Sequence, residues 1–176
     1  TIAELMKNSG TVYSFDKYKG KVGLIRQGAE RLGLSIVQAH LRDATKISDQ
    51  LQPADFVLCD APCSGLGIIR RKPEIRYKKK AEVEALPELQ YQILCSSASL
   101  VKTGGILFYS TCTLNPKENG EIAERFLKEH DSFERFLLPL PSVISRKIEE
   151  PVNQFTLFPN DYGTDGFFIS GFRRIS

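Results

Sequence analysis

The chain has 176 residues, of which 41% are hydrophobic and 26% are charged, so its composition excludes a disordered chain and a fibrous one. Its formal net charge of +3 indicates no partner by itself, and no apolar run approaches the roughly 20 residues that a membrane helix needs. The first residue is Thr1 and no secretion signal is recognisable, so we expect the sequence to be a piece of a longer chain.

Apolar periodicity divides the chain into alternating helix-like and strand-like segments. In chain order the pattern predicts a helix end at 2–7, a strand at 11–15, a helix over 22–32 stopped by Gly33, a strand at 34–39, a buried strand at 56–59, a helix at 87–101, a strand at 106–110, a helix at 118–128, and strands at 155–158 and 166–173. Such alternation is typical of a parallel sheet covered by helices. Turn-forming residues between the last two strands indicate a hairpin. We therefore predict one α/β domain, mostly parallel, with an antiparallel C-terminal edge.

Four candidate site residues stand at or just after predicted strand ends: Asp16, Asp43, Asp60 and Cys112. Ligands collect at the carboxyl ends of parallel strands, so we expect these side chains to converge on one edge of the sheet. An acid after the second strand of a Rossmann-like unit can accept both hydroxyl protons of a ribose. Each acid could equally cap a helix, and the sequence alone leaves both interpretations open.

The cysteines predict free thiols rather than a metal site or disulfides. No secretion signal accompanies the four, which favours a reducing compartment. Their spacing does not fit a structural zinc site, and both histidines are far away in sequence, so we predict no metal. Cys59 and Cys95 lie inside apolar patterns and are expected to be buried as small hydrophobic residues.

A basic strip occupies residues 70–80, where seven basic residues face the single acid Glu74. The strip carries +6, which leaves −3 for the rest of the chain. Such a strip is typical of a protein that binds a phosphate backbone, although a solvated surface would look the same. The basic residues are Arg70, Arg71, Lys72, Arg76, Lys78, Lys79 and Lys80.

Three motifs carry the chemistry of the chain: DAPCSG at 60–65 with its Ile-Arg-Arg tail, STCTLNPKEN at 110–119, and GTDGFF at 163–168. The first two place a thiol directly after a strand, beside a proline turn. In this order and spacing the motifs resemble the RNA cytosine-5 methyltransferases of the NOL1/NOP2/Sun family. The resemblance covers essentially the whole chain and is strongest to the bacterial Sun-type enzymes that modify small-subunit ribosomal RNA.

The resemblance implies a Rossmann-like methyltransferase fold, S-adenosylmethionine as cofactor, a cytoplasmic location, and RNA, expected to be 16S ribosomal RNA, as partner. Cys112 matches the cysteine that attacks carbon 6 of cytosine, and Cys63 matches the cysteine needed for product release. Asp60 matches the acid at the base edge and the cofactor, while Asp16 and Asp43 match acids that hold the ribose and adenine ends. The strip residues Arg70, Arg71, Lys72, Arg76 and Lys78 are then expected to contact RNA.

The chain departs from the family pattern at its start. Family members carry a glycine-rich loop of the type APGGKT before the helix that ends at Lys7, and this sequence has no match to it. We therefore expect residues 1–176 to be the C-terminal part of the catalytic domain, without the first strand, the cofactor loop or an N-terminal RNA-binding domain, and expect it to be weak or inactive alone. Two alternatives stay open: a non-catalytic RNA-binding or ribosome-assembly module, and the same chemistry on transfer RNA. The presence of both Cys63 and Cys112 favours an enzyme.

Overall fold

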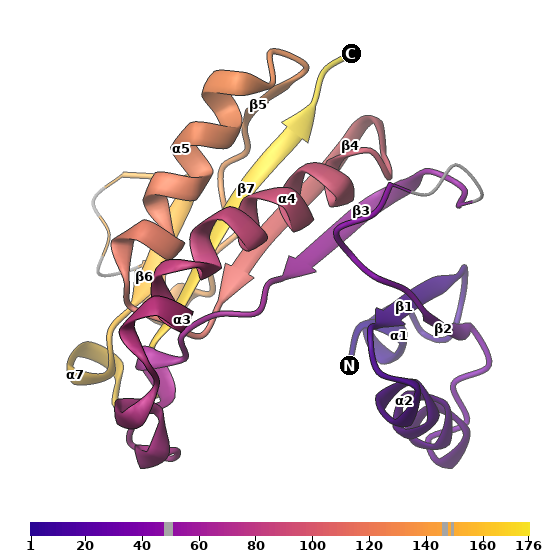
Figure 1. Cartoon of the computed structure of the whole chain (residues 1–176). Helices are drawn as coiled ribbons and strands as arrows, with labels where there is room; N and C mark the ends of the chain where they lie inside the picture. Colours follow the sequence, from indigo (N-terminus) through magenta and orange to yellow (C-terminus); the bar gives the residue numbers. More distant parts are fainter. Residues whose placement is uncertain (48–50, 146–147, 149) are drawn as a thin grey trace. The chain divides into compact units, whose positions relative to one another are not determined.

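A computed structural model describes residues 1–47, 51–145, 148 and 150–176 (Figure 1). Their contacts divide the chain into two compact units: an N-terminal unit, Thr1–Lys46, and a C-terminal unit, Ile47–Ser176. The helices in these described ranges include none that is long and apolar enough to cross a membrane.

The N-terminal unit is a small α/β unit around a two-stranded parallel sheet. Its elements are α1 (Ile2–Leu5), β1 (Val12–Asp16), α2 (Lys19–Arg31) and β2 (Val37–Leu41), with Val12 opposite Val37. The predicted stop at Gly33 is confirmed, because Gly33 follows the C-cap of α2 and adopts a left-handed backbone conformation. The predicted apolar side of α2 is only partly buried: Val22 is covered, whereas Leu24 is 67% exposed.

The C-terminal unit contains a five-stranded mixed sheet. Its strands are β3 (Ala54–Asp60), β4 (Val101–Thr111), β5 (Phe133–Arg135), β6 (Gln154–Leu157) and β7 (Phe167–Arg174). They run in the order β3-β4-β7-β5, and β6 also pairs with β7. β3 and β4 are parallel, whereas β7 is antiparallel to β4, β5 and β6. The covering helices and the antiparallel C-terminal strand are as predicted. Among the described residues, however, this sheet has one parallel pair and is mixed rather than mostly parallel, and β7 lies inside it rather than at its edge.

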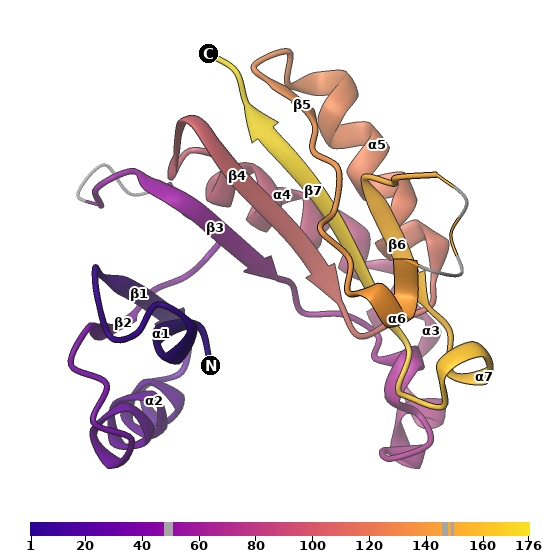
Figure 2. The ribbon, with the colours of Figure 1, turned by 180° about the vertical axis from the view of Figure 1, so that it is seen from behind.

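Helices α4 (Leu86–Ala98) and α5 (Gly120–Glu129) lie side by side on one face of this sheet (Figures 1 and 2). The shorter elements of the unit are the 3-10 turns η1 (Leu66–Ile68), η2 (Pro73–Tyr77) and η3 (Pro116–Glu118), with helices α3 (Lys80–Glu84), α6 (Ser142–Ser145) and α7 (Pro159–Tyr162). The core between sheet and helices is closed by side chains without exposed surface, among them Leu94, Leu107, Phe126 and Phe172. Burial of this apolar surface is the main stabilising term of the unit.

Two details of the predicted elements are wrong. The helix predicted over 87–101 ends at Ala98, because Val101 already pairs with Ala54 as the first residue of β4. The strand predicted to be buried is an edge of its sheet among the described residues: Phe56 is 68% exposed and Leu58 is 53% exposed, while Cys59 on the opposite face is buried. A short apolar run therefore indicated a strand correctly but did not reveal that only one of its faces is covered.

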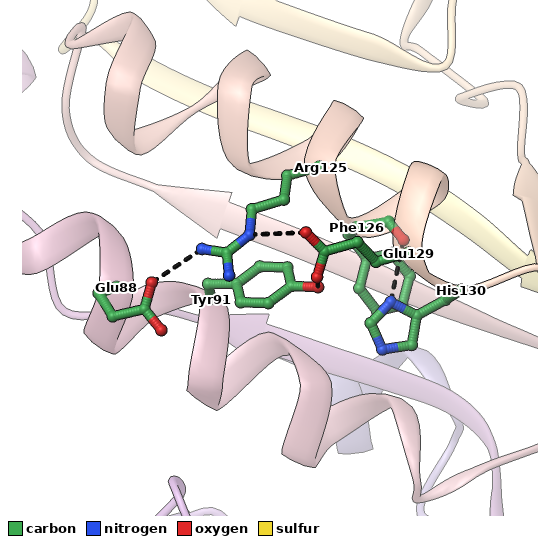
Figure 3. A network of polar contacts seen from close by, with 6 residues as sticks. All are labelled: Glu88, Tyr91, Arg125, Phe126, Glu129 and His130. Atoms are coloured by element: carbon green, nitrogen blue, oxygen red, sulfur yellow. Dashed lines mark hydrogen bonds and ion pairs between the residues drawn. The ribbon is translucent and has the colours of Figure 1, made fainter.

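A polar network ties α4 to α5 at the solvent side (Figure 3). The Arg125 guanidinium lies 3.6 Å from the centre of the Tyr91 ring and donates hydrogen bonds to Glu88 and Glu129 at 2.8 and 3.1 Å. The Tyr91 hydroxyl donates to Glu129 at 2.6 Å. The bond from Arg125 lowers the pKa of Glu88, and the bonds from Tyr91 and then Arg125 lower that of Glu129.

This network predicts a pH dependence of stability. A carboxyl whose pKa is lower in the folded state stabilises that state above its unfolded pKa, about 4.3, and the contribution is lost as the pH falls through the lowered value. Arg125→Met should therefore lower the free energy of unfolding at pH 7, and its difference from the wild type should shrink below about pH 4.3 in urea titrations at several pH values. Arg173→Met is the control, because Arg173 lies over the Phe136 ring 5.2 Å away and should keep the wild-type pH dependence. A constant difference for Arg125→Met between pH 7 and 3 contradicts the prediction.

Candidate active site

The first two motifs continue from the carboxyl ends of two neighbouring parallel strands. Asp60, the last residue of β3, lies opposite Ser110 of β4. The Ser110 hydroxyl donates to Asp60 Oδ1 at 3.1 Å, and the Ala61 N–H donates to the Ser110 carbonyl oxygen at 3.0 Å. This pairing in register brings the DAPCSG loop and the STCTLNPKEN loop side by side, as expected from a parallel sheet.

The two loops bring the thiols of Cys63 and Cys112 together. Their Sγ atoms are 3.3 Å apart, within hydrogen-bonding distance for sulfur, and both side chains are half-buried. Two thiols 49 residues apart in sequence thus form one local group. The structure therefore places the predicted nucleophile and the predicted release residue in direct contact.

The surroundings distinguish the two thiols of this pair. Burial, followed by the neighbouring Cys112, raises the pKa of Cys63 to about 12. Cys63 therefore keeps its proton at neutral pH, so its S–H is available to donate across the 3.3 Å contact between the two sulfur atoms. Burial also raises the pKa of Cys59 to about 12 and raises that of Cys95, which agrees with their prediction as apolar packing residues, although Cys95 is only half-buried.

A cation lies on the backbone of the first loop. Lys78 Nζ donates to the carbonyl oxygens of Ser64 and Cys63 at 2.8 and 3.3 Å. The structure gives the Lys78 ammonium group two acceptors in the loop that carries Cys63, and the RNA contact expected of Lys78 stays a prediction.

The third motif meets the other two through backbone contacts between glycines. The Gly67 N–H donates to the Cys112 carbonyl oxygen at 3.0 Å, and the Gly166 N–H donates to the Gly67 carbonyl oxygen at 2.8 Å. A Cβ atom on Gly67 would lie only 2.2 Å from the Gly166 carbonyl oxygen. An ion pair between Arg71 and Asp165 joins the same two segments. The glycine contact was not predicted from sequence, where Gly67 is one of several glycines after a strand.

A buried glutamate that the sequence did not single out lies between the cysteine loops. Glu118 has no exposed surface and accepts hydrogen bonds from the Ser64 N–H at 2.8 Å, Gln90 Nε2 at 2.9 Å and Asn115 Nδ2 at 2.9 Å. Beside it, the hydroxyls of Ser64 and Thr113 are 2.7 Å apart. These bonds fix the backbone immediately after Cys63 and the segment after Cys112.

The other two predicted acids belong to the N-terminal unit and have local partners. Asp16 Oδ1 accepts the Tyr18 N–H at 2.8 Å at the start of α2. Asp43 Oδ1 accepts from the Thr45 hydroxyl at 2.7 Å and N–H at 3.1 Å, which lowers the pKa of Asp43. Both acids therefore make local turn or cap contacts, which was one of the two interpretations that the sequence left open. Their convergence with Asp60 stays a prediction.

The basic strip begins in the turn after η1, continues through η2 and ends at Lys80, the first residue of α3. Its basic side chains are exposed, and the segment is anchored by Ile75, which is only 8% exposed. Arg76 lies over the ring of Tyr77 at 6.0 Å, and Tyr77 is 79% exposed. An exposed aromatic ring among basic side chains is suited to stacking on the bases of unpaired nucleotides. RNA contact by this strip stays a prediction.

The residues that the structure describes include no group of three or more His, Cys, Asp or Glu side chains arranged to hold a metal ion. The candidate site therefore consists of the thiol pair, Asp60, and the side chains that hold the two loops.

Comparison with known proteins gives matches over nearly the whole chain. The family described as 16S rRNA methyltransferase RsmB/F matches residues 1–173. A probable ribosomal RNA small subunit methyltransferase B from Bacillus subtilis is 45% identical over 98% of this chain and 40% of its own length. A tRNA (cytosine(72)-C(5))-methyltransferase from Pyrococcus horikoshii is 30% identical over 99% of this chain and 43% of its own. The structure of NSun6 from Pyrococcus horikoshii superposes with a TM-score of 0.84 at 27% identity, over 99% of this chain and 44% of that one. The chain thus spans about 40% of the length of these relatives.

Proposed function

The chain belongs to the family of 16S rRNA methyltransferases RsmB/F, and from this premise we propose that it carries the catalytic cysteines of an S-adenosylmethionine-dependent RNA cytosine-5 methyltransferase. The observation that supports this most strongly is the Cys63–Cys112 pair, with 3.3 Å between the sulfur atoms, at the ends of two parallel strands. Pure RNA binding gives no reason for two thiols in direct contact. The proposed place of action is the cytoplasm.

Cys112 acts in this proposal as the nucleophile. Carbon 5 of cytosine is too weakly nucleophilic to take a methyl group unaided, so the Cys112 thiolate adds to carbon 6 and the ring becomes an enamine-like species. Asp60 at the strand end shares a proton with ring nitrogen 3 and so stabilises the charge that develops on addition. The Ser110 hydroxyl holds Oδ1 of Asp60 and orients that carboxyl.

Cys63 acts in release. After carbon 5 has taken the methyl group, a water molecule takes its proton, and the electron pair of that C–H bond forms the carbon 5–carbon 6 double bond as the carbon 6–sulfur bond breaks. The electron pair of the broken bond leaves on Cys112, which departs as a thiolate. The S–H of Cys63, held protonated by its raised pKa, donates to that sulfur and stabilises the leaving group.

S-adenosylmethionine supplies the methyl group when it is bound. The residues present fit this group: Asp16 is half-buried at the carboxyl end of β1, and a carboxylate in such a place can accept ribose hydroxyl protons. Asp43 follows β2. Both hydrogen bonds from Thr45 go to Oδ1 of Asp43, so Oδ2 can accept a hydrogen bond from a further donor. We propose Asp16 and Asp43 as cofactor ligands on these grounds.

The proposed substrate is a cytosine of 16S ribosomal RNA, supported by the family description and the Bacillus subtilis relative. The second candidate is transfer RNA, which the Pyrococcus horikoshii relative is named for. Mapping of 5-methylcytosine by mass spectrometry, in ribosomal and transfer RNA from cells lacking the full gene, distinguishes the two. Loss at one ribosomal site supports the first, loss at a transfer RNA site supports the second, and no loss in either contradicts the catalytic proposal and favours a binding or assembly module.

The basic strip is proposed to hold the RNA backbone beside the cysteines. Arg70→Gln with Lys72→Gln should weaken binding of a ribosomal RNA fragment and reduce the slope of log affinity against log salt by about 0.7 to 0.9 per lost phosphate contact. Arg71 is left intact because it pairs with Asp165. The matched control is Lys102→Gln with Lys128→Gln, which removes two basic side chains outside the strip and should leave the slope unchanged. An unaltered slope for the strip variant in fluorescence anisotropy contradicts this role.

A further inference from the structure

The carboxylate of Glu118 joins the two cysteine loops at one point. Its Oε2 accepts the N–H of Ser64, the residue after Cys63, and also Gln90 Nε2. Its Oε1 accepts the amide of Asn115, three residues after Cys112. One side chain therefore holds the backbone of the first loop and a side chain of the second.

A carboxylate in this position needs an explanation, because burying a charge is unfavourable unless it is compensated. Glu118 has no exposed surface, and the ion pairs between described residues do not include it. Its compensation comes from the three N–H donors, which approach both oxygens. A carboxylate can accept on both sides, whereas an amide in its place would turn an NH2 group toward a donor.

We propose that Glu118 is a positioning residue that sets the distance between the Cys63 and Cys112 sulfur atoms. The inference rests on the proposed function, in which the S–H of Cys63 acts directly on the Cys112 sulfur. Two further contacts support it: the Ser64 and Thr113 hydroxyls lie 2.7 Å apart, and Gln90 Nε2 also donates to the Pro62 carbonyl oxygen at 2.8 Å. Glu118 thus lies at the centre of the contacts that hold the two loops together.

The test exchanges the donor and the acceptor of one bond. Glu118→Gln turns an NH2 group toward the Asn115 amide or toward the Ser64 and Gln90 donors, and Asn115→Asp sets two carboxylates against each other. The double variant restores complementarity, because the new amide donates to the new carboxylate while its oxygen still accepts from Ser64 and Gln90. The acceptor that Asn115 offers to the Lys117 N–H is kept as well.

The readout is the rate at which diamide oxidises Cys63 and Cys112 to a disulfide, measured by peptide mass spectrometry. The two thiols lose two hydrogen atoms, the N=N bond of diamide gains them as a hydrazine, and the sulfur–sulfur bond forms. Each single variant should react at least tenfold more slowly than the wild type, and the double variant should return to within about threefold. In the full-length protein, Glu118→Gln should also lower kcat for methylation at least tenfold with KM for RNA nearly unchanged.

Glu129→Gln is the matched control, because Glu129 is bonded to Tyr91 and Arg125 on the solvent side of α5 and should keep the wild-type oxidation rate. A wild-type oxidation rate in Glu118→Gln, or no recovery in a folded double variant, overturns the proposal. If Glu118→Gln does not fold, the comparison of Asn115→Asp with the double variant gives the same decision. The oxidation needs neither RNA nor a methyl donor. If the proposed function is wrong, the wild-type protein does not methylate RNA, and the oxidation rates still decide the role of Glu118.

Discussion

Replacing Cys112 by alanine should abolish both methylation and the covalent protein–RNA adduct, with a loss of activity on the order of 10⁴-fold or more. The reason is that carbon 5 of cytosine stays unactivated when no thiolate adds to carbon 6. Cys63→Ala should behave in the opposite way with respect to the adduct. The adduct then forms but breaks slowly, because the S–H that donates to the leaving sulfur is gone, and it should accumulate as a band that migrates slowly in a denaturing gel.

The experiment uses the full-length protein, S-adenosylmethionine and a small-subunit ribosomal RNA transcript. RNA containing 5-fluorocytidine is the positive control, since carbon 5 then carries no proton to lose and the wild type itself should be trapped. Cys95→Ala is the matched control, a half-buried thiol on α4 that should leave both readouts unchanged. An adduct that persists in Cys112→Ala and vanishes in Cys63→Ala would assign the roles the other way round. A Cys112→Ala variant with normal methylation would refute covalent catalysis by this thiol.

The thiol pair could be predicted from sequence because local patterns locate strand ends. An apolar run followed by an acid or a thiol and a proline indicates where a strand ends, and parallel neighbours end at the same edge. Asp60 and Ser110 lie opposite each other for this reason, and Cys63 and Cys112 follow within three and two residues. The sequence pattern could not give the separation of the sulfur atoms, which depends on contacts between loops.

Glu118 shows why the rest could not be predicted. A glutamate near the start of a predicted helix is normally exposed, and burial of an unpaired acid is rare. Its burial is decided by Ser64 and Gln90, which are 54 and 28 residues away in sequence. The exposure of Phe56 and Leu58 could not be predicted for a similar reason. A short apolar run has the same sequence pattern whether one face of the strand or both are covered.

Gly67→Ala should strongly destabilise the C-terminal unit. A Cβ atom there would lie 2.2 Å from the Gly166 carbonyl oxygen and 2.8 Å from that of Cys112, and both are backbone atoms that cannot move without moving their loops. The backbone of Gly67 is outside the left-handed region that favours glycine, so the effect is one of space alone. Overpacking of this kind typically costs 1 to 3 kcal/mol and here should reach about 3 kcal/mol or more.

The measurement is a urea titration of Gly67→Ala, with the shift in midpoint at unchanged slope taken as the loss of stability. Gly120→Ala is the matched control in the same unit, because a Cβ there meets only the Gln154 side chain at 3.8 Å and should change stability by less than about 1 kcal/mol. Since Gly67 donates to the Cys112 carbonyl, any folded Gly67→Ala protein should also oxidise Cys63 and Cys112 more slowly with diamide. Wild-type stability together with wild-type oxidation would show that the three motifs do not meet through this glycine.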